Sequence, residues 1–295
     1  MNLRALYQSG EHKSFHDAQQ DLELVRHIQQ NLIRLGLLEP PADGQLGPIT
    51  IATIAGFQAT LKIPEQGIGK HTCKALIEVR SMPDAPLYLD ESLASSIARY
   101  YQHRGWYFSR NSSEINICYL EGANADGQKN LDAPNEWNDR RIIWRLRAGI
   151  PTTLGNWQAS CEPGWWFTLN PMNPDGCARI KNPAQFKAWR IGVHGGAKPH
   201  PALVQVAAVE IYRDRNKDMS RTGDQLHQGL FGINQHWGYG MQFVDRASAG
   251  CMVAPDWEGH MAFIGLCKSD RRYKLNPAYT FSTAFIPGDK LNFLP

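Results

Sequence analysis

Residues Asp43–Thr50 read DGQLGPIT, a glycine-rich turn that leads directly into an apolar run. Glycine adopts turn conformations at little steric cost, and proline is favoured in the first turn of a helix. We therefore expect a helix to begin near Pro48. Its apolar positions recur at helical spacing; they are Ile51, Ile54 and Phe57.

The segments on either side of this turn extend the helical pattern. Upstream, apolar residues at helical spacing precede Gly36, which stands where a helix C-cap belongs; they are Val25, Ile28, Leu32 and Leu35. Downstream, Gly69–Thr72 repeats the glycine turn followed by an early threonine, and Ala75 and Leu76 continue a third helix. The first eighty residues therefore predict three short helices.

This pattern resembles the peptidoglycan-binding three-helix module. The family's recurring elements are present as Leu35–Leu38, Asp43–Thr50 and Phe57-Gln58, within a match that covers about Leu22–Val79. Its second half departs from the family, because Gln66-Gly67 replaces Asp-Gly. The resemblance implies binding to peptidoglycan, through its glycan strand or stem peptide. A generic helical bundle used for oligomerisation or regulation is the alternative.

A domain boundary is predicted next, where Pro83 and Pro86 interrupt a stretch without helical periodicity. We expect a module at residues 1–84, with its core at 22–79, and a second domain at 85–295. The second domain begins with a helix that Asp90 is expected to cap, and β-branched residues then dominate short runs. The predicted fold class is a multidomain α and β chain with a larger, mainly-β (α+β) domain.

Composition narrows the possible partners. The chain has 295 residues, of which 42% are hydrophobic, and its formal net charge is only +3. No long apolar run and no dense Lys/Arg run is present, so neither membrane insertion nor nucleic-acid binding is expected. Met1–Phe15 is too polar for a signal peptide, which predicts synthesis in the cytoplasm. The six cysteines lack paired spacing and are expected to be reduced.

One cysteine lies in a pattern that suggests catalysis. The stretch Gly229–Gly238, GLFGINQHWG, is followed by Ser248–Cys251, SAGC. A thiol nucleophile needs a base to remove its proton and donors for the oxyanion that forms on attack. We expect Cys251 to be the nucleophile and His236 its base. Gly250 permits close backbone approach, so the amides of Gly250 and Cys251 are expected to face the oxyanion.

The same stretch resembles the L,D-transpeptidase family, in which a His in an apolar strand precedes Ser/Thr-x-Gly-Cys. The resemblance implies that Cys251 forms a thioacyl-enzyme with a stem peptide, acting as a transpeptidase or peptidase at the bacterial cell wall. It also implies an L,D-transpeptidase-like fold and a role for Ser248. Trp237 and Gly238 are assigned to substrate contact, although Trp237 departs from the family by preceding that glycine. The connection of residues 237–247 is short, and Met252–Ala254 lacks the arginine often found there.

Several alternatives remain open at this stage. His194, in Gly192–Gly195, also resembles the family's His-Gly strand and is placed second, as a residue that lines the same cleft. No cofactor and no metal is expected, because the histidines show no tight ligand spacing. A zinc peptidase would draw on them instead; they are His194, His200, His236 and His260. A lysozyme-like activity would need Glu121 or Glu162, and a catalytically dead wall-binding protein is the last alternative.

Overall fold

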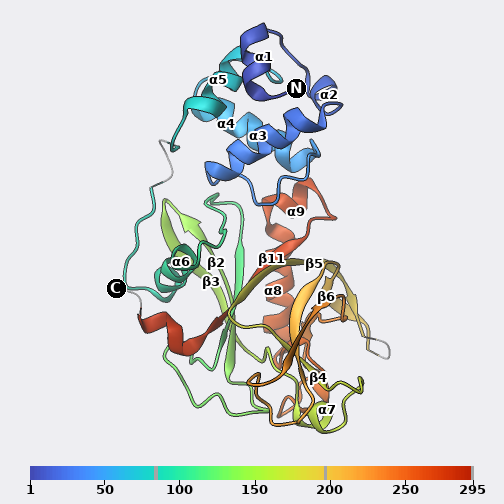
Figure 1. Cartoon of the computed structure of the whole chain (residues 1–295). Coiled ribbons are helices and arrows are strands. Elements are labelled where there is room, and N and C mark those ends of the chain that lie inside the picture. Colours follow the sequence, from blue (N-terminus) through green and yellow to red (C-terminus); the bar gives the residue numbers. More distant parts are fainter. Residues whose placement is uncertain (83–85, 196–197, 294–295) are drawn as a thin grey trace.

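The computed structural model describes residues 1–82, 86–195 and 198–293. It forms a helical N-terminal module, blue in Figure 1, and a larger mainly-β domain drawn in green to red. This two-domain α+β architecture confirms the predicted fold class. The predicted boundary between residues 84 and 85 lies outside the described residues.

The module contains five helices among its described residues, whereas the sequence predicted three. They are α1 (Leu3–Ser9), α2 (Phe15–Ala18), α3 (Leu22–Arg34), α4 (Pro48–Thr60) and α5 (Lys70–Glu78). The extra helix α1 is capped by the Asn2 side chain, which accepts a hydrogen bond from the amide of Ala5. Leu3 and Leu6 are buried in the module core. That core therefore begins well before residue 22.

Two glutamines give the module its internal repeat. Gln29 Nε2 donates to Asp43 Oδ1 at 2.7 Å and to Thr50 Oγ1 at 3.4 Å, which fixes the first glycine turn against α3. Gln58 Nε2 donates to the Gly67 carbonyl at 2.7 Å and to Thr72 Oγ1 at 2.8 Å in the second. Buried amides must be paired to avoid a desolvation cost. Each turn is therefore held by one interior glutamine.

The large domain is built on an eight-stranded sheet with the order β10-β9-β6-β5-β11-β1-β2-β3. A bridge between Ser160 and Val253 joins its two ends, with N–H···O distances of 2.8 and 2.9 Å, so the sheet closes on itself. Its strands are β1 (Asn116–Glu121), β2 (Asp139–Arg147), β3 (Ile150–Ala159), β5 (Ala184–His194), β6 (His200–Gln205), β9 (Gln235–Trp237), β10 (Met252–Ala254) and β11 (Phe281–Pro287).

Shorter elements surround this sheet. A three-stranded sheet has the order β4-β7-β8, from β4 (Cys177–Ile180), β7 (Val209–Asp214) and β8 (Gln225–Gly229). The helices are α6 (Leu93–Arg104), α7 (Trp165–Leu169), α8 (Trp257–Ser269) and α9 (Arg271–Leu275), with 3-10 turns η1 (Asp245–Ala247) and η2 (Gly288–Phe293). The cap of α6 is Ser92, not the predicted Asp90, because Ser92 Oγ accepts the Ser95 amide. Asp90 instead accepts the Ser95 hydroxyl at 2.6 Å.

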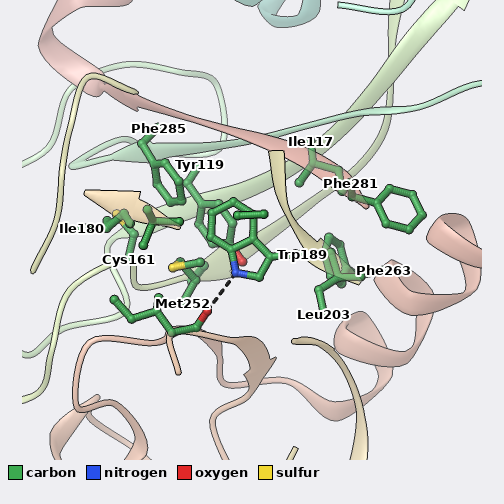
Figure 2. Close-up of a cluster of buried hydrophobic side chains, with 14 of the residues drawn as sticks. Ile117, Tyr119, Cys161, Ile180, Trp189, Leu203, Met252, Phe263, Phe281 and Phe285 are labelled. Atoms are coloured by element: carbon green, nitrogen blue, oxygen red, sulfur yellow. Dashed lines mark hydrogen bonds between the residues drawn. The ribbon is translucent and has the colours of Figure 1, made fainter. Parts of the chain in front are cut away.

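The large core ties the sheet to the segment that precedes β9. Trp189 is fully buried on β5 among residues that include Phe281 and Phe285. Figure 2 shows its indole N–H pointing to a backbone carbonyl, which belongs to Ile233 and lies 2.8 Å away. Because a buried indole N–H needs an acceptor, this bond anchors the chain just before the residues of interest.

A buried carboxylate joins the module to the large domain. Glu39, between α3 and α4, lies 3.2 Å from Lys187 Nζ and 3.7 Å from Arg272 Nη1. It also accepts hydrogen bonds from the hydroxyls of Tyr279 and Ser282. Burial opposes its ionisation, but Lys187 and then Arg272 outweigh burial and hold the pKa of Glu39 below its ordinary value. The module is therefore docked through an ionised side chain.

Candidate active site

Two short parallel strands bring the predicted nucleophile and base together. β9 pairs with β10 so that His236 faces Val253, and Cys251 immediately precedes β10. The amide of Asn234, just before β9, donates to Cys251 Sγ at 3.3 Å. Neighbouring strand ends place these side chains within one small region, as a short connection allows. Of the six cysteines, all of which are unpaired, only Cys251 is partly exposed.

A cavity of about 480 Å³ opens over Cys251. His194 and His236 line it together, although they are far apart in the sequence. Its walls also come from α7, β4, β7 and the segment before β9. The wall residues include Phe167, Met172, Ala178, Arg213, Phe231, Ile233, Tyr239 and Arg246. Within the described chain, the expected nucleophile and both candidate histidines therefore face one space.

Hydrogen bonds distinguish the two histidines. His236 Nδ1 lies 2.7 Å from the Trp237 carbonyl, so this nitrogen carries the proton and Nε2 keeps a free lone pair. His194 Nδ1 lies 2.8 Å from the side-chain amide of Asn234, which donates to it. That arrangement places the proton of His194 on Nε2. The two rings stack with centroids 3.7 Å apart. Among the described residues, the lone pair on His236 Nε2 therefore has no hydrogen-bond partner, whereas that on His194 Nδ1 accepts from Asn234.

The pair is neutral in the free protein. Burial, followed by the neighbouring His194, lowers the pKa of His236 well below its ordinary value. Burial raises the pKa of Cys251 to about 11, although the Asn234 amide partly opposes that shift. Cys251 is therefore a thiol and His236 an uncharged imidazole at neutral pH. A nucleophilic attack by this thiol would require that a base remove its proton as the new bond to sulfur forms.

A buried arginine supports the strands beneath the site. Arg141 Nη2 donates to the carbonyls of His236 and Met252, each at 3.3 Å, and Nε donates to the Tyr119 hydroxyl at 2.6 Å. Its Nη1 lies 3.1 Å from His260 Nδ1, whose pKa falls to about 3 through burial and then Arg141. These bonds join β9 and β10 at their carbonyls, which holds the strand of His236 against the strand that follows Cys251.

The predicted oxyanion donors need a correction. The Gly250 amide donates to Ser248 Oγ at 3.1 Å, and that hydroxyl donates to the Cys251 carbonyl at 2.7 Å. Gly250 is therefore committed to shaping the turn, not to the oxyanion. Glycine is needed there because φ is +125° and any Cβ at this position would lie only 2.6 Å from the Ala178 carbonyl oxygen. Among the described residues, the Cys251 amide has no hydrogen-bond partner and is available.

Trp237 and Gly238 do not line the cavity. The Trp237 indole donates to the Pro255 carbonyl at 3.0 Å, and its ring packs against Trp257 with centroids 4.9 Å apart. Successive residues of a strand face opposite sides, so Trp237 points away from the face that His236 uses. Gly238 lies where a Cβ would meet the Trp137 ring at 2.5 Å. Both residues therefore have packing roles.

The glutamates of the lysozyme alternative occupy another region. Glu121 and Glu162 line a second cavity of about 490 Å³. Glu121 accepts two hydrogen bonds from Arg221, and Glu162 pairs with Arg179. Burial raises the pKa of Glu162 to about 7, against the opposing effect of Arg179. Both carboxylates are engaged by guanidinium groups.

The zinc alternative gains no support from the described residues, among which no group of three or more His, Cys, Asp or Glu is arranged to hold a metal ion. His200 instead makes a 2.9 Å contact with the Lys198 carbonyl, and His260 one of 2.8 Å with that of Pro201.

Comparisons with known proteins identify one part of the chain. Residues 21–75 match the family of putative peptidoglycan binding domains. No curated protein matches the sequence. One matching crystal structure is a fused Zn-dependent amidase/peptidase/peptidoglycan-binding domain-containing protein from Clostridium acetobutylicum, at 11% identity over 88% of this chain and 94% of the other. Its TM-score of 0.29 is too low to assign the large domain.

This match indicates that the partner of residues 21–75 is peptidoglycan, the polymer of the bacterial cell wall. None of the helices in the described ranges is both long enough and apolar enough to cross a bilayer.

We expect residues 1–82, produced alone, to sediment with purified sacculi, because the helices form a separate core. A Gln58→Leu variant, which leaves Thr72 and Gly67 without their partner, should be less stable to urea by about 1–3 kcal/mol. If unmutated residues 1–82 stay in the supernatant of the sacculus sedimentation, the assignment of a peptidoglycan-binding domain is contradicted.

Sequence reasoning missed four residues of the site. Asn234 contacts both Cys251 and His194, and it lies in the GLFGINQHWG stretch, where only the histidine was singled out. Tyr239 lies just beyond that stretch. Arg213 and Arg246 had no local motif, because β7 and η1 meet Cys251 only in the folded chain.

Proposed function

We propose that this protein acts on stem-peptide amide bonds of peptidoglycan through a Cys251/His236 thioacyl mechanism, as a transpeptidase or peptidase. The observation that carries the proposal is the cavity in which a partly exposed thiol lies with an imidazole whose Nδ1 is anchored to the Trp237 carbonyl. The peptidoglycan-binding domain on the same chain supports the choice of substrate. The resemblance of Ser248–Cys251 to the L,D-transpeptidase motif supports the choice of reaction.

The reaction proceeds in two balanced steps. His236 Nε2 takes the proton from Cys251 as Sγ attacks the amide carbonyl carbon, and the Cys251 amide donates to the oxyanion. The C–N bond then breaks, the imidazolium returns its proton to the leaving amine, and a thioester remains. An acceptor amine or water attacks that thioester, loses a proton to His236, and releases Cys251 as the thiolate that regains this proton. An amine acceptor gives a cross-linked peptide, and water gives hydrolysis.

The test is digestion of sacculi followed by mass spectrometry of the soluble and muramidase-released muropeptides. We expect shortened or newly cross-linked stem peptides with intact glycan strands. Cleaved glycosidic bonds would instead favour the Glu121/Glu162 cavity, and loss of activity with a chelator would favour a metal peptidase. An unchanged muropeptide profile would mean that the large domain only binds the wall, which would refute the proposal.

A further inference from the structure

The cavity over Cys251 has an unbalanced charge. Arg213, on β7, and Arg246, on η1, both line it, and its described lining contains no Asp or Glu. Across the described ranges, no carboxylate lies within the 4.0 Å ion-pair distance of either guanidinium. The two histidines add no charge of their own at neutral pH, since the pKa of each is lowered, by burial first.

Neighbouring groups orient both arginines without neutralising them. Arg213 Nη1 donates to the Gly176 carbonyl at 3.1 Å, and its guanidinium lies 5.3 Å from the centre of the Phe231 ring. The Arg246 guanidinium lies 4.3 Å from the centre of the Trp166 ring. A guanidinium that lies over an aromatic ring keeps its charge, and its remaining N–H groups can bind a carboxylate in a bidentate manner.

Three neighbouring acidic side chains do not neutralise these arginines. Asp245, adjacent to Arg246, accepts the Trp166 amide at 3.2 Å through its carboxylate. Asp175 and Asp224 share a separate hollow with Arg213 but do not line the cavity over Cys251. An anion that entered the cavity would therefore meet two cations, a thiol and apolar walls.

We propose that Arg213 and Arg246 select an acyl donor that carries a free carboxylate close to its scissile amide. This assignment rests on the proposed function for the identity of the donor as a stem peptide. The apolar wall, which includes Phe167 and Ile233, accommodates the aliphatic part of that donor.

Alkylation of Cys251 tests the charge of the cavity without requiring turnover. Iodoacetate is an anion and iodoacetamide its neutral analogue, and both form the same S–C bond with loss of iodide. The rate of each reagent at Cys251 is measured on the full chain at low salt by peptide mapping. We expect the iodoacetate-to-iodoacetamide rate ratio to fall about tenfold in R213Q/R246Q, because two nearby cations no longer attract the anion.

The controls separate charge from structure. R215Q removes an equal charge from an exposed position outside the cavity and should leave the ratio unchanged. R213K retains the charge and should retain most of the ratio, while R246Q alone tests the exposed arginine without disturbing the fold. A ratio that is the same in wild type, R246Q and R213Q/R246Q would overturn the proposal.

A substrate measurement then separates this inference from the proposed function. For a muropeptide and its carboxamide analogue, R213Q/R246Q should raise KM for the carboxylate form alone. A changed alkylation ratio without turnover of either muropeptide would support the anion site and refute the stem-peptide reaction. Turnover with equal KM values for both forms in the wild type would support the reaction and refute carboxylate selection.

Discussion

Replacement of Cys251 by alanine is expected to abolish peptide-bond chemistry on sacculi while leaving the fold intact. Loss of a nucleophile typically lowers kcat by several orders of magnitude, about 10⁴-fold or more. The side chain is small and partly exposed. Within the described ranges, Sγ accepts one hydrogen bond, from the Asn234 amide at 3.3 Å, and donates one, to the Gly232 carbonyl at 3.6 Å. Mass spectrometry of muropeptides measures the activity, and thermal unfolding measures the fold.

Cys177 provides a matched control for this variant. It lines the same cavity but is buried, and burial raises the pKa of its thiol to about 11, as for Cys251. We propose no histidine as a base for the Cys177 thiol. Cys177→Ala should therefore retain activity within about tenfold. Full activity in Cys251→Ala, or an equal loss in both variants, would exclude Cys251 as the nucleophile.

Replacement of His236 by alanine has the second largest expected effect, a loss of about 10²–10⁴-fold in kcat/KM at neutral pH. We propose His236 as the base because its Nδ1 is bonded to the Trp237 carbonyl and its Nε2 keeps a lone pair. Among the described residues, no charged group lowers the pKa of Cys251. The loss should shrink as pH rises toward the thiol pKa of about 11, because hydroxide then removes the thiol proton directly. The pH profile of iodoacetamide reaction at Cys251 measures the same effect independently of substrate.

His194→Ala is the matched control for the base. Removal of this ring relieves the burial and the charge interaction that lower the pKa of His236. A raised pKa means that His236 becomes protonated at a higher pH, so the acid limb of the activity profile should move upward. The activity at a pH of about 8 should change by less than about tenfold. If His194→Ala removes the neutral-pH activity and His236→Ala does not, the base has been assigned to the wrong ring.

Patterns along the sequence predicted the elements whose structure depends on residues that are close together in the chain. The turn at Asp43–Thr50 located α4 directly, and the periodic residues before Gly36 located α3. The short helix α1 gave no such signal, because only Leu3 and Leu6 are buried and the packing partner, α5, lies far along the chain. In the large domain, the runs of β-branched residues indicated strands, but they carried no information on strand order.

The site shows the same limit. The spacing of His236 and Cys251 reflects two paired strands, so the sequence could indicate both residues. His194 was placed second, as a residue that lines the same cleft, and it does line the cavity, but its stacking on the His236 ring was not predicted. The amide of Gly250 was expected to point to the oxyanion, but Ser248 Oγ accepts it. These outcomes depend on side-chain partners that become neighbours only after folding, which spacing along the chain does not encode.

The contact of Glu39 with the large domain affects how the cavity over Cys251 is placed relative to peptidoglycan bound by the module. In Figure 1, α7, which contributes Phe167 to the cavity, lies at the end of the large domain remote from α1–α5. A flexible tether would let the reactive thiol sample many bonds around each point of attachment. The ion pairs of Glu39 with Lys187 and Arg272 restrict that freedom, because they hold the module against the large domain. Under the proposed function, each attachment presents a limited set of bonds, and reaching bonds further away requires the protein to dissociate and rebind.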